Sequence, residues 1–253
     1  MTPEQLLKNG LKELGITCSK EQISAFMAFL SELKKWSRAY NLTALKTDED
    51  IIIKHFLDSL LYLKVIEDSV KCQVSSVKLK SPKNVIPAEA GIQRSLSLLD
   101  SRFYGNDHLE YLQYLQLKIC DVGTGAGFPG IPIKILCPEM EITLIEPSRK
   151  KAAFLRHIIR ILKLKNVTVL EQRLESLGKA YEKSYDVIIS RAAFKVKDFL
   201  KKVCPYVKVD GLLILSKGPG VFEEIEGLGA AKKILRFELP FVKAQRNLLI
   251  LRC

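Results

Sequence analysis

Three alternating glycines are the residues of this chain best suited to holding a nucleotide-like ligand. The apolar run 117–123 ends at Gly123. Gly125 and Gly127 follow in the next segment, TGAGFPG. Glycines there allow a tight turn and let a ligand approach the backbone without a Cβ clash. A dinucleotide fingerprint needs glycine at position 128, where this chain has Phe128, which disfavours NAD and FAD. The loop instead favours S-adenosylmethionine, with a plain strand-to-helix turn as the alternative.

Acidic side chains near the ends of the apolar runs could bind other parts of such a ligand. Asp121 lies at the end of the first run and could face the cationic portion. Glu146 ends the next run, where a carboxylate can accept the ribose hydroxyls. Its alternative role is that of a solvent-exposed strand-end carboxylate. In the RLES segment, the Leu174 backbone and Glu175 could reach the adenine edge.

The segment SRAAF, residues 190–194, ends another apolar run and carries Arg191, without an Asn-Pro-Pro-type loop or a Pro-Cys nucleophile. No general base is evident, which favours an acceptor that has no proton to lose. Guanine N7 has a free lone pair and can attack a sulfonium methyl directly, so positioning and charge placement would suffice. Arg191 could orient the guanine, because its fork matches the O6/N7 edge. The alternative is a salt-bridged strand-end arginine.

Other polar residues are expected to be structural. His55 lies in the apolar segment IIIKHFLDSL, where a single histidine is usually part of the core. Lys54 and Asp58 are four residues apart, which predicts an exposed helical pair. Lys217 and Gly218 end a further apolar run, on the same side as the glycine loop.

The hydrophobic pattern indicates how these residues are positioned. Residues 3–67 show helical spacing, with Thr2 as N-cap, and predict an N-terminal helical cap over 1–72. Residues 117–253 predict an S-adenosylmethionine-binding domain of alternating strands and helices. Its expected strands are 117–123, 141–147, 166–171, 185–191 and 211–218, its helices 133–137, 148–164 and 195–204, and its closing strand pair 234–240 and 246–253.

This alternation predicts an α/β fold: a Rossmann-like, doubly wound, mostly parallel sheet with an antiparallel C-terminal strand. Ligands of such sheets bind at the C-terminal strand ends, near the switch point. Residues 73–116 fit neither part because their periodicity is poor and they contain several prolines and glycines. We predict a flexible surface insertion there, in preference to a functional lid.

The charge balance points to a polyanionic partner. The chain has 253 residues and a formal net charge of +12, which suits nucleic acid or an anionic membrane surface. Residues 119–253 carry 24 basic and 14 acidic residues, whereas residues 1–70 are nearly balanced. The run 149–165 holds seven basic residues and no acid. It could be a functional basic patch or a solvated helix face.

The six cysteines form no CxxC pair and no zinc-type cluster with histidine, so no metal site is predicted. Cys120 and Cys204 lie in apolar runs and are expected to behave as small hydrophobes. The polar N-terminus does not resemble a signal peptide, and no stretch is long and apolar enough to span a membrane. A reduced, cytoplasmic protein is the expectation.

The chain resembles the ribosomal RNA small subunit methyltransferase G family, also called glucose-inhibited division protein B. The resemblance is most specific over 121–132 and covers about 33–67 and 117–218. The matching segments are Trp36 with Asn41-Leu42-Thr43, KHFLDS at 54–59, DVGTGAGFPGIP at 121–132, Lys150-Lys151 with Phe154-Leu155, Arg173 to Glu175, Ser190-Arg191-Ala192, and Lys217-Gly218.

The resemblance implies a class I S-adenosylmethionine-dependent methyltransferase that methylates guanine N7 in 16S rRNA of the small ribosomal subunit. It places cofactor contacts on Gly123, Phe128, Leu174, Glu175 and Arg191. The argument from the residues adds Gly125, Gly127 and Glu146. Two departures concern the RNA side: Ser37 stands where the family often has Asn, and the stretch 73–112 is longer than the family's connection.

We therefore expect a monomeric enzyme that transfers methyl in line from S-adenosylmethionine, without a covalent enzyme intermediate. Arg191 is its predicted substrate-orienting residue. Three alternatives stay open at this point. They are a methyltransferase for a small molecule or protein, a non-catalytic RNA-binding protein with a vestigial cofactor site, and, disfavoured by Phe128, an NAD-dependent oxidoreductase.

Overall fold

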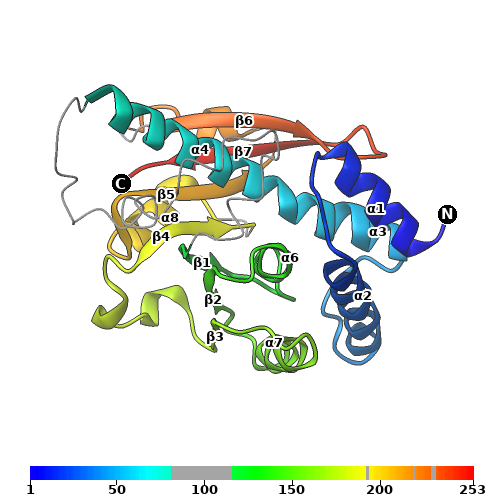
Figure 1. The fold of residues 1–253 in the computed structure, drawn as a ribbon. Coiled ribbons are helices and arrows are strands. Elements are labelled where there is room, and N and C mark those ends of the chain that lie inside the picture. Colours follow the sequence, from blue (N-terminus) through cyan, green and yellow to red (C-terminus); the bar gives the residue numbers. More distant parts are fainter. Residues whose placement is uncertain (81–115, 192–193, 219, 229–231) are drawn as a thin grey trace.

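One mixed sheet forms the centre of the molecule (Figure 1). The computed structural model describes residues 1–80, 116–191, 194–218, 220–228 and 232–253. The strands of these residues lie in the order β3-β2-β1-β4-β5-β7-β6. They are β1 Lys118–Val122, β2 Glu141–Ile145, β3 Val167–Leu170, β4 Tyr185–Ser190, β5 Val207–Lys217, β6 Lys232–Glu238 and β7 Gln245–Leu251.

The direction of the strands confirms the predicted fold class. β1 pairs in parallel with β2 and with β4, and the parallel pairing continues to β3 and β5. β7 inserts between β5 and β6 and is antiparallel to both. The chain leaves β1 toward β2 on one side and later returns to β4 on the other, so the carboxyl end of β1 is the switch point.

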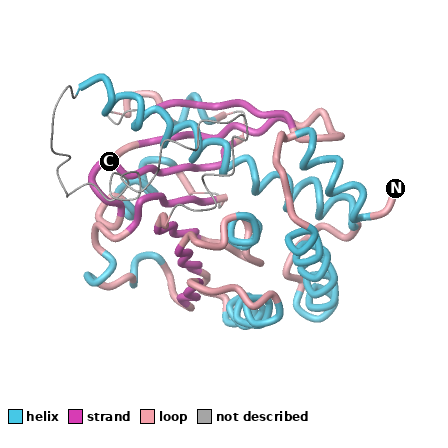
Figure 2. Tube along the Cα trace, in the orientation of Figure 1, coloured by secondary structure: helices cyan, strands magenta, loops and turns pink. Residues whose placement is uncertain are grey.

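Helices surround this sheet (Figure 2). In the first part of the chain they are α1 Pro3–Glu13, α2 Lys20–Tyr40, α3 Asp48–Ile51, a π-helix over Ile52–Leu57, and α4 Asp58–Lys80. In the second part they are α6 Gly130–Leu136, α7 Arg149–Ile161, α8 Val196–Val203 and α9 Val221–Glu224, with single 3-10 turns at Leu174–Ser176 and Lys179–Tyr181.

Local capping signals fix where the first helices begin and end. The Thr2 hydroxyl accepts the Gln5 N–H at 3.2 Å, which confirms the predicted N-cap of α1. Ser19 and Gln22 form a reciprocal capping box at the start of α2. Asn41 ends α2 in the left-handed region, at φ 50°.

The two faces of the sheet bury different cores. Successive strand residues point to opposite sides, so Ile119 of β1 belongs to one core and Cys120 to the other. The first core includes α6, α7 and the helical cap, whereas the second is covered by α8. The Phe29 ring lies 5.1 Å from Phe128 and 6.2 Å from Phe154, centroid to centroid, so the cap and the sheet share one core.

Polar contacts attach α2 to the sheet domain as well. The Gln22 side-chain amide donates to the carbonyls of Ile135 and Leu136 at the end of α6, at 3.1 and 3.2 Å. His157 on α7 lies 2.6 Å from a Glu32 carboxylate oxygen on α2. The bonds from Gln22 satisfy carbonyls that the end of a helix otherwise leaves open. The cap therefore has a fixed orientation relative to the strand ends.

Some predicted boundaries differ from the structure. α4 continues to Lys80, so residues 73–80 of the expected insertion are helical, and residues 81–115 lie outside the described part. Ser148 precedes α7 as predicted, but its side chain makes no capping hydrogen bond. Cys204 was expected to be a small reduced hydrophobe. It forms a disulfide with Cys253, because β7 brings the chain end beside the end of α8.

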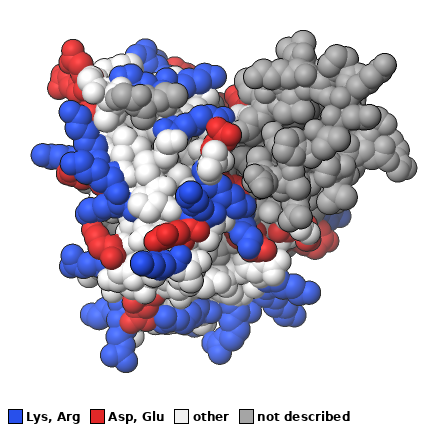
Figure 3. All heavy atoms as spheres, turned by 90° about the vertical axis from the view of Figure 1, so that its left-hand side faces the viewer, with Lys and Arg blue, Asp and Glu red and all other residues white. Residues whose placement is uncertain are grey.

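Basic side chains are not confined to one side of the molecule. Figure 3 shows the face on which β7 and α4 end, which is the amino-terminal edge of the parallel strands. Lys and Arg line the left and lower edges of this face, with Asp and Glu between them. The net charge of +12 is therefore spread beyond the edge where the glycine loop lies. Among the described helices, none is long and apolar enough to cross a membrane.

Candidate active site

The glycine loop joins β1 to α6 at the switch point, and its shape depends on three left-handed residues. Gly123, Gly125 and Gly127 have φ of 70°, 63° and 97°. A Cβ on Gly127 would lie 2.6 Å from Ile131 Cγ1, so close packing also requires glycine there. A Cβ on Gly125 would meet nothing within 4 Å. Gly127 thus serves the packing of the loop, whereas Gly125 borders open space in which a ligand could approach.

Glu146 connects the glycine loop to the start of α7. One of its carboxylate oxygens accepts the Gly125 N–H at 2.9 Å, and the other accepts the Ser148 N–H at 2.9 Å. The residue is 5% exposed, so the predicted solvent-exposed alternative is wrong. Each carboxylate oxygen can accept more than one hydrogen bond, so both retain capacity for ribose hydroxyls.

Asp121 lies fully buried beneath the loop. One carboxylate oxygen accepts the Thr124 hydroxyl at 2.6 Å and the Gly130 N–H at 2.9 Å. The other, Oδ1, has no hydrogen-bond partner among the described residues. Burial raises the pKa of Asp121 to about 6, although the bonds from Thr124 and Gly130 act in the opposite direction. A cation placed near this oxygen would stabilise the ionised carboxylate.

Phe128 is buried and forms the contact between the glycine loop and the cap. Its ring stacks on the His55 imidazole with centroids 4.4 Å apart, and the Arg191 guanidinium carbon lies 5.3 Å from its centroid. The aromatic ring therefore fills a place that a dinucleotide fingerprint would leave to glycine. The structure brings Phe128 and Arg191 together, whereas the cofactor contacts expected of them stay predictions.

Arg191 follows β4 and is held by groups from the cap. Its Nη1 donates to Asp58 Oδ2 at 3.1 Å and to the Lys54 carbonyl at 3.2 Å, and its Nη2 lies 3.0 Å from His55 Nδ1. The prediction that Lys54 and Asp58 form an exposed pair is wrong. Asp58 is 6% exposed, and the Lys54 ammonium pairs with Asp50 at 2.5 Å.

His55 has a defined tautomer because of its partners. Arginine has no acceptor, so His55 Nδ1 must accept from Arg191. Nε2 then carries the proton and donates to the Thr43 hydroxyl at 2.7 Å. Burial, with the Arg191 charge as second cause, lowers the pKa of His55 to about 3. The imidazole is therefore neutral, and both of its nitrogens are engaged.

Asp58 has a second arginine partner that sequence reasoning missed. Arg246 on β7 donates from Nε to Asp58 Oδ1 at 2.8 Å. No local motif surrounds Arg246 in the sequence, and 188 positions separate the two residues. We refer to Thr43, His55, Asp58, Arg191 and Arg246 as the cap junction. It joins the cap to the end of β4 and to the start of β7, beside the glycine loop.

The remaining predicted residues occupy less central places. Leu174 is buried in the core beneath α8, and the Glu175 carboxylate pairs with Lys202 at 2.5 Å. The hydrogen bond from Lys202 lowers the pKa of Glu175. No described contact joins either residue to the glycine loop. Lys217 at the end of β5 donates to Glu224 at 2.7 Å and to the Phe194 carbonyl.

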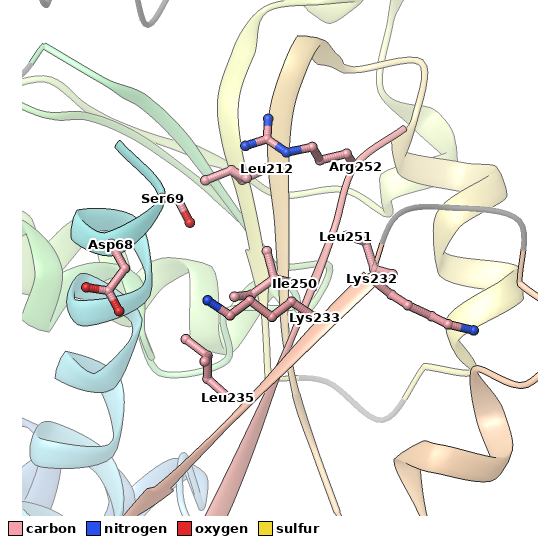
Figure 4. A pocket seen from close by; sticks show the side chains of 9 residues that line it. All are labelled: Asp68, Ser69, Leu212, Lys232, Lys233, Leu235, Ile250, Leu251 and Arg252. Atoms are coloured by element: carbon pink, nitrogen blue, oxygen red, sulfur yellow. The ribbon is translucent and has the colours of Figure 1, made fainter. Parts of the chain in front are cut away.

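A separate hollow of about 220 Å³ lies between α4 and the β6–β7 edge (Figure 4). Lys232, Lys233 and Arg252 line it, but their charged ends point in different directions. Lys232 donates to the Ile225 carbonyl and Arg252 to the Asp210 carbonyl. Its lining shares no residue with the glycine loop or with the cap junction, so this hollow does not form part of the candidate active site. Within the described residues, no cluster of His, Cys, Asp or Glu could hold a metal ion.

The model of the GidB family, rRNA small subunit methyltransferase G, matches residues 22–76 and 95–249. The chain belongs to this family. It is 32% identical to the ribosomal RNA small subunit methyltransferase G of Acetivibrio thermocellus, over 98% of this chain and 87% of that one. It is 34% identical to the protein of that name from Carboxydothermus hydrogenoformans, over 94% and 83%. The resemblance found in the motifs is thus confirmed.

A third curated relative carries the same name. The same-named protein of Geotalea uraniireducens is 31% identical over 99% of this chain and 96% of its own. Among solved structures, a predicted O-methyltransferase of Agrobacterium tumefaciens covers 54% of this chain and 74% of its own, at 23% identity and a TM-score of 0.47.

Proposed function

We propose that the chain methylates guanine N7 in 16S rRNA of the small ribosomal subunit, with S-adenosylmethionine as methyl donor. The family supports methyl transfer to small-subunit rRNA. The observation that carries the proposal within this chain is the glycine loop with its two buried carboxylates. Gly123 and Gly125 leave the backbone accessible, and Glu146 has acceptor capacity for a ribose. Asp121 Oδ1, which has no partner among the described residues, could face a cation.

The residues fit the cofactor that the family implies. S-adenosylmethionine supplies an activated methyl group when bound. The chain's part is to hold a cationic ligand, and the unpartnered Asp121 Oδ1 is a group that such a ligand would satisfy. Glu146 sets the position of the loop that would receive the nucleoside, because it fixes Gly125. The assignments of Leu174 and Glu175 rest on the resemblance.

The cap junction supports a reaction that needs no general base. His55 has a pKa of about 3 and both nitrogens engaged, so it cannot take a proton at neutral pH. Each carboxylate oxygen of Asp58 already accepts a hydrogen bond from an arginine. Guanine N7 loses no proton on direct methylation, so in-line transfer without a covalent intermediate suits these residues.

Arg191 is the residue we assign to substrate orientation. The cap occupies three of its N–H groups, leaving Nε–H and one Nη2–H without a partner among the described residues. A donor to N7 would occupy the lone pair that must attack. We therefore propose that Arg191 donates to the guanine O6 and leaves N7 free. This refines the O6/N7 contact inferred from the sequence.

The test is transfer of radiolabelled methyl to small subunits that lack the modification, followed by mapping of the labelled base. Label at N7 of one guanine in 16S rRNA is expected, with Arg191→Lys at least about tenfold slower because a point charge replaces the fork. Label that appears in protein or small molecules and never in rRNA would overturn the proposal.

A further inference from the structure

A small hollow of about 190 Å³ lies where α2 ends and the chain turns toward α3. The residues that line it come from the last turns of α2, from the segment leading into α3 and from α3 itself. They are Lys34, Ser37, Arg38, Leu45, Lys46 and Ile51.

The hollow contains hydrogen-bond donors without acceptors. Ser37 is 8% exposed, and its hydroxyl has no hydrogen-bond partner among the described residues. A buried polar group in that state costs free energy, which a bound acceptor would recover. Lys34 is neutralised by Asp48, but no carboxylate of the described chain pairs with Arg38 or Lys46. One buried hydroxyl and two unpaired cations are the groups that bind a phosphate.

The hollow is connected to the candidate active site. Thr43 lies between Arg38 and Lys46 in the chain. Its hydroxyl accepts a hydrogen bond from His55, which in turn contacts Arg191. In the same last turn of α2, Tyr40 is 46% exposed and lies 5.5 Å from the Trp36 ring, centroid to centroid. The Lys150 ammonium at the start of α7 lies 5.8 Å from the Tyr40 centroid. An exposed aromatic ring beside cations is the arrangement that binds single-stranded RNA.

We propose that this hollow binds a backbone phosphate of the RNA substrate, with Ser37, Arg38 and Lys46 as its ligands and Tyr40 as the surface for a neighbouring base. The inference rests on the proposed function, because it takes small-subunit rRNA as the substrate. It assigns a role to Ser37, the position at which the chain departs from the Asn frequent in the family. It also places an RNA contact on the cap, in addition to any contact with the basic helix α7.

The test measures binding of free 16S rRNA at several salt concentrations for the Arg38→Gln/Lys46→Gln double variant. Two lost phosphate contacts should weaken binding about tenfold and reduce the slope of log K against log salt by about 1.4. The matched control is Lys179→Gln, an exposed lysine before β4 on the amino-terminal edge, which should change neither quantity.

Ser37→Ala separates the hydroxyl from the charges. It should weaken binding severalfold without changing the salt slope, because no charge is lost, and thermal unfolding should show that the fold is intact. Wild-type affinity and slope in the double variant would overturn the inference. So would a loss seen with assembled subunits but not with free rRNA, since a ribosomal protein would then be the partner. Absence of methyl transfer by the wild type would instead refute the proposed function, while the binding measurement still decides this inference.

Discussion

The glycine loop and the cap junction lie side by side, but they are built in different ways. The loop is held by backbone geometry: three left-handed glycines and N–H groups that donate to Glu146 and Asp121. The cap junction is held by side chains, with one buried carboxylate between two arginines. The loop should therefore be sensitive to any added Cβ, and the junction to loss of a charge.

The largest expected effect is at the centre of the junction. Asp58→Ala removes the counter-charge of two arginines that are largely buried, so we expect it to lower the free energy of unfolding by about 3 kcal/mol. Asp50→Ala breaks an exposed pair in the same region and should lower the free energy of unfolding far less. Urea unfolding measures both. Equal losses in the two variants would show that the junction contributes no more than a surface pair.

Two alanine substitutions test the loop. Gly127→Ala combines a left-handed alanine with a contact at 2.6 Å, and should cost about 2–3 kcal/mol of stability. Gly125→Ala has the strain without the contact, at about 1 kcal/mol, but places a methyl in the open space beside the loop. Calorimetric titration measures the affinity of each variant for S-adenosylmethionine. Relative to its loss of unfolding free energy, Gly125→Ala should lose more affinity than Gly127→Ala. The reverse order would mean that this space is not where the ligand lies.

His55 allows the junction to be tested without changing a charge. In His55→Asn, the side-chain oxygen can take the place of Nδ1 and accept from Arg191, whereas His55→Gln places its amide near the position of Nε2. Both variants lose the ring that stacks on Phe128. We expect kcat/KM of the Gln variant to fall about thirtyfold and that of the Asn variant clearly less. Identical losses would attribute the role of His55 to stacking.

The two regions also contribute to acid stability, with opposite signs. Between about pH 4 and 6 the folded state binds a proton at Asp121, whose pKa is raised to about 6, which favours folding as pH falls. His55, whose pKa is lowered to about 3, remains unprotonated when folded, which favours unfolding as pH falls. In Asp121→Asn only the second contribution remains. Stability of that variant should fall by up to about 1.4 kcal/mol per pH unit more than that of the wild type. Urea unfolding of both proteins at several pH values from 6.5 to 4.5 measures this. Equal dependence of the unfolding free energy on pH in the two proteins would contradict the prediction.

The loop could be predicted from the sequence because its parts are close together in the chain. A strand, three glycines and a carboxylate within about one βαβ unit define their own geometry. The junction could not, because Arg191 and Arg246 reach Asp58 from 133 and 188 residues away. Only the folded sheet brings these three residues together. For the same reason Asp58 was assigned to the surface, since spacing in a helix gives no information on what packs against it.

The disulfide and the unpartnered hydroxyl of Ser37 could not be predicted from the sequence for a similar reason. Cys204 and Cys253 have no motif and meet only because β7 runs back along β5. Ser37 was noted in the sequence as a departure from its family. That its hydroxyl has no partner could be learned only from the packing of α2 against the segment that follows it.

The bond between Arg246 and Asp58 bears on the order in which the protein matures during synthesis. Asp58 and the whole glycine loop leave the ribosome well before β7, which comes near the end of the described chain. A nascent chain could form the cap and much of the parallel sheet while Asp58 still lacks one of its two cations. The carboxylate that holds Arg191 is then balanced only after the last strand has paired. Methyl transfer competence should therefore appear late in folding, after the bulk of the core has formed.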